Sequence, residues 1–204
     1  MNGILVSFEG IDGSGKSTQA ALFADYVRSM GRETVLLREP GGTEVGEQIR
    51  RVLLDASNMD LLPLAELFLY LAARAQITGE RIRPALARDA VVILDRFIDS
   101  TAAYQGHARG LGMDRVAELN RIATDGLVPD LTIVVDCDPA VAASRVNRPP
   151  DRMEAEGPSF MSTVREGFLL LSRRHPERIR CVEGARPVAV VAAQVREVAA
   201  GLLV

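Results

Sequence analysis

The sequence predicts an α/β fold in which a doubly wound, five-stranded parallel sheet carries helices on both faces. Short β-rich runs alternate with longer helical patterns along the 204 residues, which is typical of consecutive βαβ units. The runs LVSF, VVIL and TIVV are nearly continuous in apolar residues, as expected of strands that are covered on both faces. No repeat, low-complexity tract or long linker divides the chain, so we expect a single domain over residues 1–204.

The strands and helices follow one another in a regular order. We expect strands at residues 4–9, 34–38, 90–95, 131–136 and 179–182. We expect helices at residues 16–30, 44–55, 63–87, 113–124, 139–146, 159–174 and 187–202. Gly31, Gly126 and Gly184 stand where helix ends and turns belong. We interpret residues 136–139 as a strand end followed by a helix cap.

The composition disfavours several classes of partner. The chain has 24 basic and 27 acidic side chains, a net charge of −3, 4% aromatic residues and no Trp, which disfavours a nucleic-acid partner. No run reaches the ~18 apolar residues of a membrane span. The N-terminus lacks a signal-peptide pattern, so we expect no membrane partner and a cytoplasmic location. Cys137 and Cys181 lie in apolar runs, and we expect both to be buried.

A glycine-rich loop joins the first expected strand to the first expected helix. It matches G-x-x-x-x-G-K-[ST] and comprises Gly10, Ile11, Asp12, Gly13, Ser14, Gly15, Lys16, Ser17 and Thr18. Glycines allow positive φ, so backbone N–H groups can turn toward phosphate oxygens, and the helix N-terminus adds the positive end of its dipole. We therefore predict a nucleotide site in which Lys16 reaches the β and γ phosphates and Ser17 offers its hydroxyl to Mg²⁺.

The loop alone fits a GTPase, an ATPase motor or a kinase. Lys16 is the only lysine, and the other 23 basic residues are arginines. A GTPase of the common kind reads guanine with N-K-x-D, and that motif cannot occur here. The only lysine side chain, with its compact ammonium group, therefore lies in the loop where binding of phosphate requires such a group.

A second pair of charged residues follows the third expected strand. Asp95 and Arg96 come directly after the apolar run VVIL, so the strand delivers a carboxylate and a guanidinium beside the phosphate loop. A carboxylate there suits the water shell of Mg²⁺, and an arginine suits a bidentate grip on phosphate. We predict that Asp95 and Ser17 serve the metal, and we prefer Asp95 to Asp136 for this role.

Four segments make the chain similar to the bacterial thymidylate kinase family. They are FEGIDGSGKST at 8–18, REPGGT at 38–43, YLAARAQ at 70–76 and DRFIDSTAAYQ at 95–105, and a DRME run follows at 151–154. The first is generic to phosphate loops, whereas the second and fourth together are highly specific. The resemblance implies a P-loop kinase fold and transfer of the γ-phosphoryl of Mg-ATP to dTMP, which gives dTDP and ADP for dTTP synthesis.

The resemblance also implies which residues contact the thymine base. Tyr70, where the family usually has Phe, would stack on the thymine ring. Arg74, one helical turn later and therefore on the same face, would hydrogen-bond the base. Thr101 and Gln105 stand at positions where the family contacts the base.

Further substrate contacts follow from the same resemblance. Arg38 and Arg96 would hold the monophosphate. Asp12 would bind the sugar 3′-OH and help to orient the Mg²⁺ cluster. Tyr104 would stand under C2′ of the sugar, where a ribose hydroxyl would clash with it.

The lid is expected at about residues 147–156, because Pro149 and Pro150 prevent a continued helix. Some family members carry an arginine directly after the loop acid, where this chain has Gly13. The arginine that neutralises the transferred phosphoryl must then come from elsewhere. We expect Arg145 at the nucleotide, and Arg148 and Arg152 beside Lys16 and Arg96 in catalysis. We favour Arg152, because Asp151 and Glu154 could hold its side chain.

The complete prediction is an ATP-dependent dTMP kinase with Mg²⁺ as cofactor. The family implies a homodimer, with residues 63–75 or the helix after Arg96 as interface. Two alternatives stay open from the residues alone. One is a kinase for another nucleoside monophosphate or for a deoxynucleoside. The other is a non-catalytic P-loop switch that binds nucleotide to control a partner.

Overall fold

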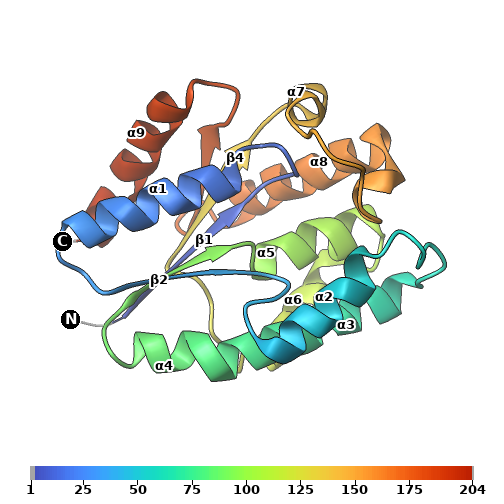
Figure 1. Cartoon of the computed structure of the whole chain (residues 1–204), viewed down its shortest axis with the longest axis horizontal. Coiled ribbons are helices and arrows are strands. Elements are labelled where there is room, and N and C mark those ends of the chain that lie inside the picture. The colour runs from blue at the N-terminus through green and yellow to red at the C-terminus, as the bar shows by residue number, and fades with distance from the viewer. Residues whose placement is uncertain (1–2, 204) are drawn as a thin grey trace.

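The five strands form one parallel sheet in the computed structural model, which describes residues 3–203. They are β1 (Ile4–Glu9), β2 (Thr34–Arg38), β3 (Val91–Asp95), β4 (Leu131–Asp136) and β5 (Ile179–Glu183). The strand order is β2-β3-β1-β4-β5, and each neighbouring pair is parallel. The predicted fold class is confirmed, and β1 lies at the centre with β3 and β4 on its two sides (Figure 1).

Helices and short helical turns fill the intervals between the strands. The helices are α1 (Lys16–Ser29), α2 (Glu44–Leu54), α3 (Pro63–Ile77), α4 (Arg83–Leu86), α5 (Ile98–Thr101), α6 (Met113–Ala123), α7 (Pro139–Ser144), α8 (Pro158–Arg174) and α9 (Val188–Ala199). Two π-helical turns, η1 (Thr78–Ile82) and η2 (Ala102–Ala108), continue α3 and α5. Two 3₁₀ turns are η3 (Glu154–Glu156) and η4 (Ala200–Leu202).

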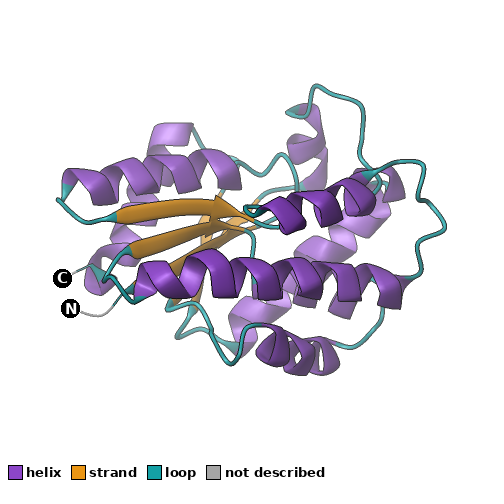
Figure 2. Ribbon diagram, turned by 60° about the horizontal axis from the view of Figure 1, so that its bottom comes forward, coloured by secondary structure: helices purple, strands orange, loops and turns teal. Residues whose placement is uncertain are grey.

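The strands alternate their side chains between two apolar layers. On one face Val6, Phe8 and Ile93 pack with residues of α1 and α9. On the other face Leu5 and Val92 pack with residues of the α3–α4 segment. Figures 1 and 2 show the sheet between these helical layers, with strand ends pointing toward the loops that carry the site. Burial on both faces explains why the strand sequences are almost entirely apolar.

Several expected boundaries differ from the structure. The segment 63–87 is helical, but η1 interrupts its regular hydrogen bonding just before Pro84, which has no N–H to donate. The expected helix after Arg96, for which the sequence predicts no bounds, spans residues 98–108 and is formed by α5 and η2. Its residues are mostly buried, so no apolar stripe with helical spacing marks it in the sequence.

The same burial corrects one of the two candidate dimer interfaces. The helix after Arg96 packs against α6 and α8 within the chain, and none of residues 98–108 is exposed, which disfavours it as an interface. The prediction that both thiols are buried is wrong for one of them. Cys137 is buried as expected, whereas Cys181 on the edge strand β5 is exposed. Within residues 3–203 no helix has the length and apolarity that crossing a membrane requires.

Candidate active site

The phosphate loop leaves β1 and enters α1 through three glycines with positive φ. Gly10, Gly13 and Gly15 have φ values of 137°, 80° and 101°, a region that other residues rarely adopt. Lys16 is the first residue of α1, and its side chain turns back so that Nζ lies 2.9 Å from Asp12 Oδ1. The loop therefore has the glycine-dependent turn and the enclosed ammonium group that the motif predicts.

Gly13 also has a steric reason to lack a side chain. A Cβ atom at this position would lie 2.1 Å from the carbonyl oxygen of Ala142 in α7. An arginine directly after Asp12 would therefore require α7 to move. Asp138 caps α7 through Ala140 N at 2.9 Å, as the interpretation of residues 136–139 predicts. The absence of a loop arginine is thus linked to the position of α7.

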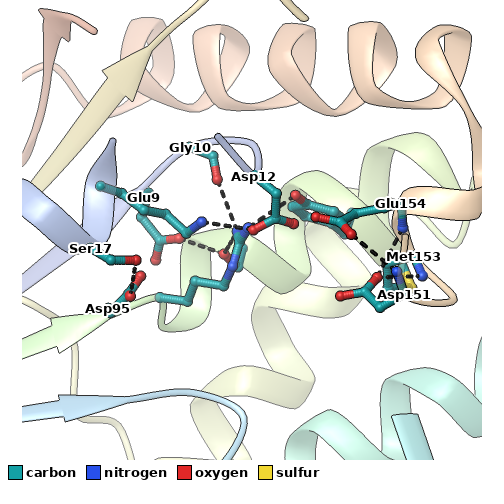
Figure 3. Close-up of polar contacts among 12 residues, drawn as sticks. Glu9, Gly10, Asp12, Ser17, Asp95, Asp151, Met153 and Glu154 are labelled. Carbon is teal, nitrogen blue, oxygen red and sulfur yellow. Dashed lines mark hydrogen bonds and ion pairs between the residues drawn. The ribbon is translucent and has the colours of Figure 1, made fainter. Parts of the chain in front are cut away.

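Asp95 and Ser17 meet at the carboxyl end of β3. Ser17 Oγ donates a hydrogen bond to Asp95 Oδ2, while the buried Asp95 Oδ1 has no hydrogen-bond partner within residues 3–203 (Figure 3). A free carboxylate oxygen beside a hydroxyl suits Mg²⁺, which keeps several waters and binds one or two carboxylates plus phosphate oxygens. The described residues hold no cluster of three or more His, Cys, Asp or Glu side chains that could hold a metal. These two residues fit an ion that arrives with a nucleotide.

Arg96 is the centre of a buried polar cluster. It adopts a positive φ of 74° and donates to Gly10 O at 2.9 Å and to Asp12 Oδ1 at 2.8 Å. It also donates to Ser100 Oγ, and its guanidinium lies 5.1 Å from the ring centre of Tyr104. Burial is the largest single effect and opposes its charge, but Asp12, together with Tyr104, Asp95 and Glu9, outweighs burial and raises the pKa of Arg96. A permanently charged guanidinium at the loop suits an anionic ligand.

Asp12 joins the two basic groups of the site. Burial opposes ionisation of its carboxyl, but Arg96 and Lys16 outweigh burial and hold the pKa of Asp12 well below its usual range. Figure 3 places Asp12 between the Ser17–Asp95 pair on one side and the lid residues Asp151 and Glu154 on the other. The carboxylate is therefore ionised at neutral pH and lies where two ligand sites meet.

Glu9 is a buried carboxyl group that contacts the residues following Arg96. It accepts hydrogen bonds from Phe97 N and Ser100 Oγ, and it is fully buried. Burial, followed by repulsion from Asp99, raises the pKa of Glu9 from 4.5 to about 7. The folded state therefore holds a proton on Glu9 that the unfolded chain releases at lower pH.

This raised pKa predicts a pH-dependent stability. The folded state binds more protons than the unfolded state between about pH 4.5 and 7, so stability falls as pH rises through that window. We expect Glu9→Gln to gain about 2 kcal/mol over the wild type between pH 5 and pH 8. Urea unfolding without nucleotide or Mg²⁺ measures this difference. Equal effects of the substitution at both pH values would contradict the account of Glu9.

A cavity opens next to Arg96 and receives most of the predicted substrate residues. Its wall combines polar groups from the phosphate loop, the segment after β2, α2, α3, the segment after β3, α5, η2 and the lid. The lining residues are Asp12, Glu39, Pro40, Arg50, Leu54, Tyr70, Arg74, Arg96, Ser100, Thr101, Tyr104, Gln105, Arg148, Asp151 and Met153. We call it the acceptor cavity. It brings together Tyr70, Arg74, Thr101, Tyr104 and Gln105 as the sequence leads us to expect.

Arg74 is more deeply engaged than its predicted role suggests. Its exposed fraction is 1%, and its Nε and Nη2 donate to Glu39 Oε2 at 2.9 and 2.7 Å. Its remaining N–H groups donate to Thr101 Oγ1, Asn120 Oδ1 and Phe97 O. All five donors of the guanidinium are thus used within the protein. Contact with a base stays a prediction and requires that Arg74 share or exchange one of these partners.

The two arginines of the β2–α2 region have different positions. Arg38, predicted to hold a monophosphate, donates through Nη2 to both carboxylate oxygens of Glu47 at 2.9 Å and does not line the acceptor cavity. Arg50, which the sequence argument missed, does line it and donates to Pro40 O. Gly46, Arg50 and Leu53 have i, i+4, i+7 spacing and therefore share one face of α2, and Gly46 and Leu53 are buried. This spacing could have indicated that Arg50 points inward.

A second cavity of about 680 Å³ lies on the other side of the phosphate loop. Its wall is formed by the loop, the start of α1 and residues 184–188. Arg145 lines this cavity and donates a hydrogen bond to Gly184 O at 3.0 Å. Arg145 therefore lies beside the phosphate loop, and its contact with a nucleotide stays a prediction. We call it the donor cavity. Lys16 lines this cavity and contacts Asp12, which lines the acceptor cavity, so the two cavities adjoin.

The two lid arginines lie in different surroundings. Arg152 is buried, with its Nη1 2.6 Å from Glu66 Oε2 and its Nε donating to Leu53 O. Arg148 lines the acceptor cavity and is held by Glu154 at 2.7 and 2.8 Å. The expectation that neighbouring carboxylates hold Arg152 is wrong, because Glu154 holds Arg148 and a residue of α3 holds Arg152. Arg148 is therefore the lid arginine that faces the site.

Comparisons with known proteins identify relatives of this chain along most of its length. The family model of thymidylate kinase matches residues 8–195. A thymidylate kinase of Caldanaerobacter subterraneus subsp. tengcongensis is 46% identical over 192 residues, which cover 94% of this chain and 92% of that protein. One from Chlorobaculum tepidum is 47% identical over 191 residues, 88% of this chain and 89% of the relative. A crystal structure of the Ehrlichia chaffeensis thymidylate kinase aligns with a TM-score of 0.79 at 34% identity, covering 97% of this chain and 99% of that one.

Proposed function

The chain belongs to the thymidylate kinase family, and from this premise we propose how its own residues bind the two substrates and transfer the phosphoryl group. It is an ATP-dependent phosphotransferase that phosphorylates dTMP. This residue assignment rests on one observation: the donor and acceptor cavities adjoin at the Lys16–Asp12 pair. ATP would occupy the donor cavity, and dTMP would occupy the acceptor cavity.

On the donor side, the phosphate loop would hold the triphosphate. The backbone N–H groups of residues 10–15 and Lys16 would bind the phosphate oxygens, and Arg145 would border the nucleotide. Asp95 and Ser17 would hold the Mg²⁺ that accompanies ATP. When bound, that ion neutralises charge on the β and γ phosphates.

On the acceptor side, Arg96 would bind the phosphate of dTMP. Arg50 borders the same cavity, and Arg38 can join only by leaving Glu47. An oxygen of the acceptor phosphate is itself the nucleophile, so no general base is required. Asp12 would orient Lys16 and Arg96 and accept from the sugar 3′-OH.

The rest of the acceptor cavity would recognise deoxyribose and base. The ring of Tyr104 is fixed by Phe160 and Phe168 at centroid distances of 6.2 Å, so it could not yield to a 2′-OH. Tyr70 would stack on thymine, and Arg74, Thr101 and Gln105 would face its polar edge. Arg148 would approach the transferred phosphoryl when the lid at 147–156 closes.

The acceptor specificity is tested by following ADP formation with Mg-ATP and a panel of nucleotides. We expect dTMP to be preferred over thymidine, over other deoxynucleoside monophosphates and over ribonucleotides. A preference for thymidine would indicate a nucleoside kinase. ATP binding without any turnover that depends on an acceptor would indicate a nucleotide-controlled switch.

We also propose a homodimer, which buries exposed apolar side chains of α2, α3 and the loop between them. This surface comprises Val45, Val52, Met59, Leu62, Leu64 and Phe68. Phe68 is 52% exposed, although its aromatic ring would gain most from burial.

We further propose that one P-loop kinase domain accounts for the chain. Its end residues 1–2 and 204 lie outside the described part of the chain. We propose the cytoplasm as its location, because ATP and free thiols belong to a reducing compartment.

The dimer surface predicts a charge-sensitive association. We expect the wild type to sediment at twice the 22.1 kDa of one chain, and Phe68→Glu to sediment as a monomer, because a carboxylate would be buried in an apolar interface. Leu22→Glu on α1 provides a matched control, since Leu22 is also exposed but lies on another face. A wild-type monomer, or a dimeric Phe68→Glu variant, would contradict this surface.

A further inference from the structure

Glu66 is a buried carboxylate that contacts three other parts of the protein. It lies on α3 and is completely buried. Its Oε1 accepts from Gln105 Nε2 at 2.8 Å. Its Oε2 lies 2.6 Å from Arg152 Nη1 and 3.2 Å from Arg109 Nη2. A carboxylate with no water around it is stabilised only by such donors.

The same contact fixes the orientation of the Gln105 amide. Both oxygens of Glu66 are surrounded by donors, so Glu66 can face Gln105 only as an acceptor. Gln105 must then present its NH₂ group to Glu66. The opposite orientation would set two oxygens against each other in a buried site.

The amide oxygen of Gln105 is consequently left for a ligand. Gln105 is 1% exposed and lines the acceptor cavity. Among the side-chain hydrogen bonds of residues 3–203, the one that involves the Gln105 amide runs from its Nε2 to Glu66. Glu66 itself does not line the cavity, so it acts only through its neighbour. The cavity therefore presents a fixed acceptor at the position of Gln105.

Thymine and cytosine differ in the group that would meet this acceptor. Thymine carries an N3–H donor between two carbonyl oxygens, whereas cytosine has a lone pair at N3. A buried acceptor that cannot rotate pairs with the first ring and repels the second. A glutamine free to rotate would offer its NH₂ group to the second ring equally well.

We propose that Glu66 is a positioning residue for base selection: it locks the Gln105 amide so that the carbonyl oxygen accepts from thymine N3–H. The inference rests on the proposed function, because it requires dTMP in the acceptor cavity. Arg109 and Arg152 hold the carboxylate in place from the other side, and Arg109 is itself paired with Glu156 at 2.6 Å. Glu66 therefore contacts both the lid, through Arg152, and the side chain that would read the nucleobase, Gln105.

A double-mutant cycle tests the proposal with a probe that alters the N3 edge. The monophosphate of 2′-deoxy-5-methylisocytidine keeps the 4-oxo and methyl groups of dTMP, but it has a lone pair at N3. The readout is the ratio of kcat/KM for dTMP to kcat/KM for this analogue. It is measured in the wild type, Glu66→Gln, Gln105→Leu and the double variant.

We expect Glu66→Gln to lower this ratio about tenfold or more, because Gln105 can then rotate. Gln105→Leu lowers the ratio as well, and the double variant shows no further loss beyond Gln105→Leu. A purely structural role would reduce the amount or activity of enzyme for both substrates and leave the ratio unchanged. An unchanged ratio in Glu66→Gln, or effects that multiply in the double variant, would overturn the inference.

A structure of the unmodified protein with dTMP provides a test that needs no stable variant. We expect the Gln105 amide to stay on Glu66 and to lie within about 3 Å of thymine N3. An amide that has left Glu66, or an N3 contacted by another residue, would overturn the inference. A wild type without dTMP-dependent turnover would overturn the proposed function and this inference together, whereas an active enzyme with an unchanged ratio overturns this inference alone.

Discussion

Replacement of Lys16 by alanine is expected to remove nearly all turnover while leaving the fold intact. Its Nζ belongs to the only lysine of the chain and is enclosed at the phosphate loop, where charge develops on the transferred phosphoryl. Losing one well-placed donor of this kind lowers kcat about 10³-fold. The fold should persist, because Asp12 keeps its contact with Arg96 at 2.8 Å.

Lys16→Arg is the matched variant, because it keeps the charge but changes its shape. A planar guanidinium cannot occupy a cradle that encloses a compact ammonium, so we expect it to be nearly as inactive as the alanine variant. Steady-state kcat with saturating Mg-ATP and dTMP measures both, and thermal unfolding checks the fold. Turnover within threefold of the wild type for either variant would contradict the assignment of the loop.

Arg148→Ala is expected to lower kcat about 10³-fold with little change in the Kd of ATP. Gly13 cannot carry an arginine while α7 holds its position, so the charge must come from the lid. Arg148 faces the acceptor cavity, where Glu154 is its ion-pair partner and Pro149 O accepts a further hydrogen bond. An arginine that meets the phosphoryl mainly in the transition state contributes to kcat rather than to ground-state affinity.

Arg152→Ala is the matched control, and its expected effect is on stability. Arg152 is buried against Glu66, so its removal leaves a buried carboxylate short of one partner. Breaking such a pair typically destabilises a protein by about 3–5 kcal/mol. Urea unfolding and kcat for each variant separate the two roles. A kcat within a few fold of the wild type for Arg148→Ala would mean that Lys16, Arg96 and the metal meet the transition-state charge without the lid.

Local patterns in the sequence were sufficient for much of the fold. Continuous apolar runs predicted the strands, because helices bury both faces of the sheet. The phosphate loop and the Asp95–Ser17 pair also followed from residues whose place at a strand end is fixed by the fold. The bounds of the helix after Arg96 could not be predicted, since a π-helical stretch buried on most sides has no amphipathic spacing.

The partners of charged residues were not accessible in this way. Arg152 has acidic neighbours in sequence, yet its partner Glu66 lies 86 residues earlier on α3. Arg74 similarly depends on Glu39 and Asn120, which reach it from other elements. Side-chain pairing across long sequence separations is decided by tertiary packing, which no local pattern encodes. The choice between Arg148 and Arg152 therefore required the structure.

The most direct test of the account is the fate of the γ-phosphoryl group in one reaction mixture. The protein is mixed with Mg²⁺, dTMP and ATP labelled at the γ position, and the labelled products are separated. The account predicts that label moves into dTDP in equal amount to the ADP formed, and that no transfer occurs without dTMP. Label that appears as inorganic phosphate regardless of dTMP, or that stays in ATP, would contradict it.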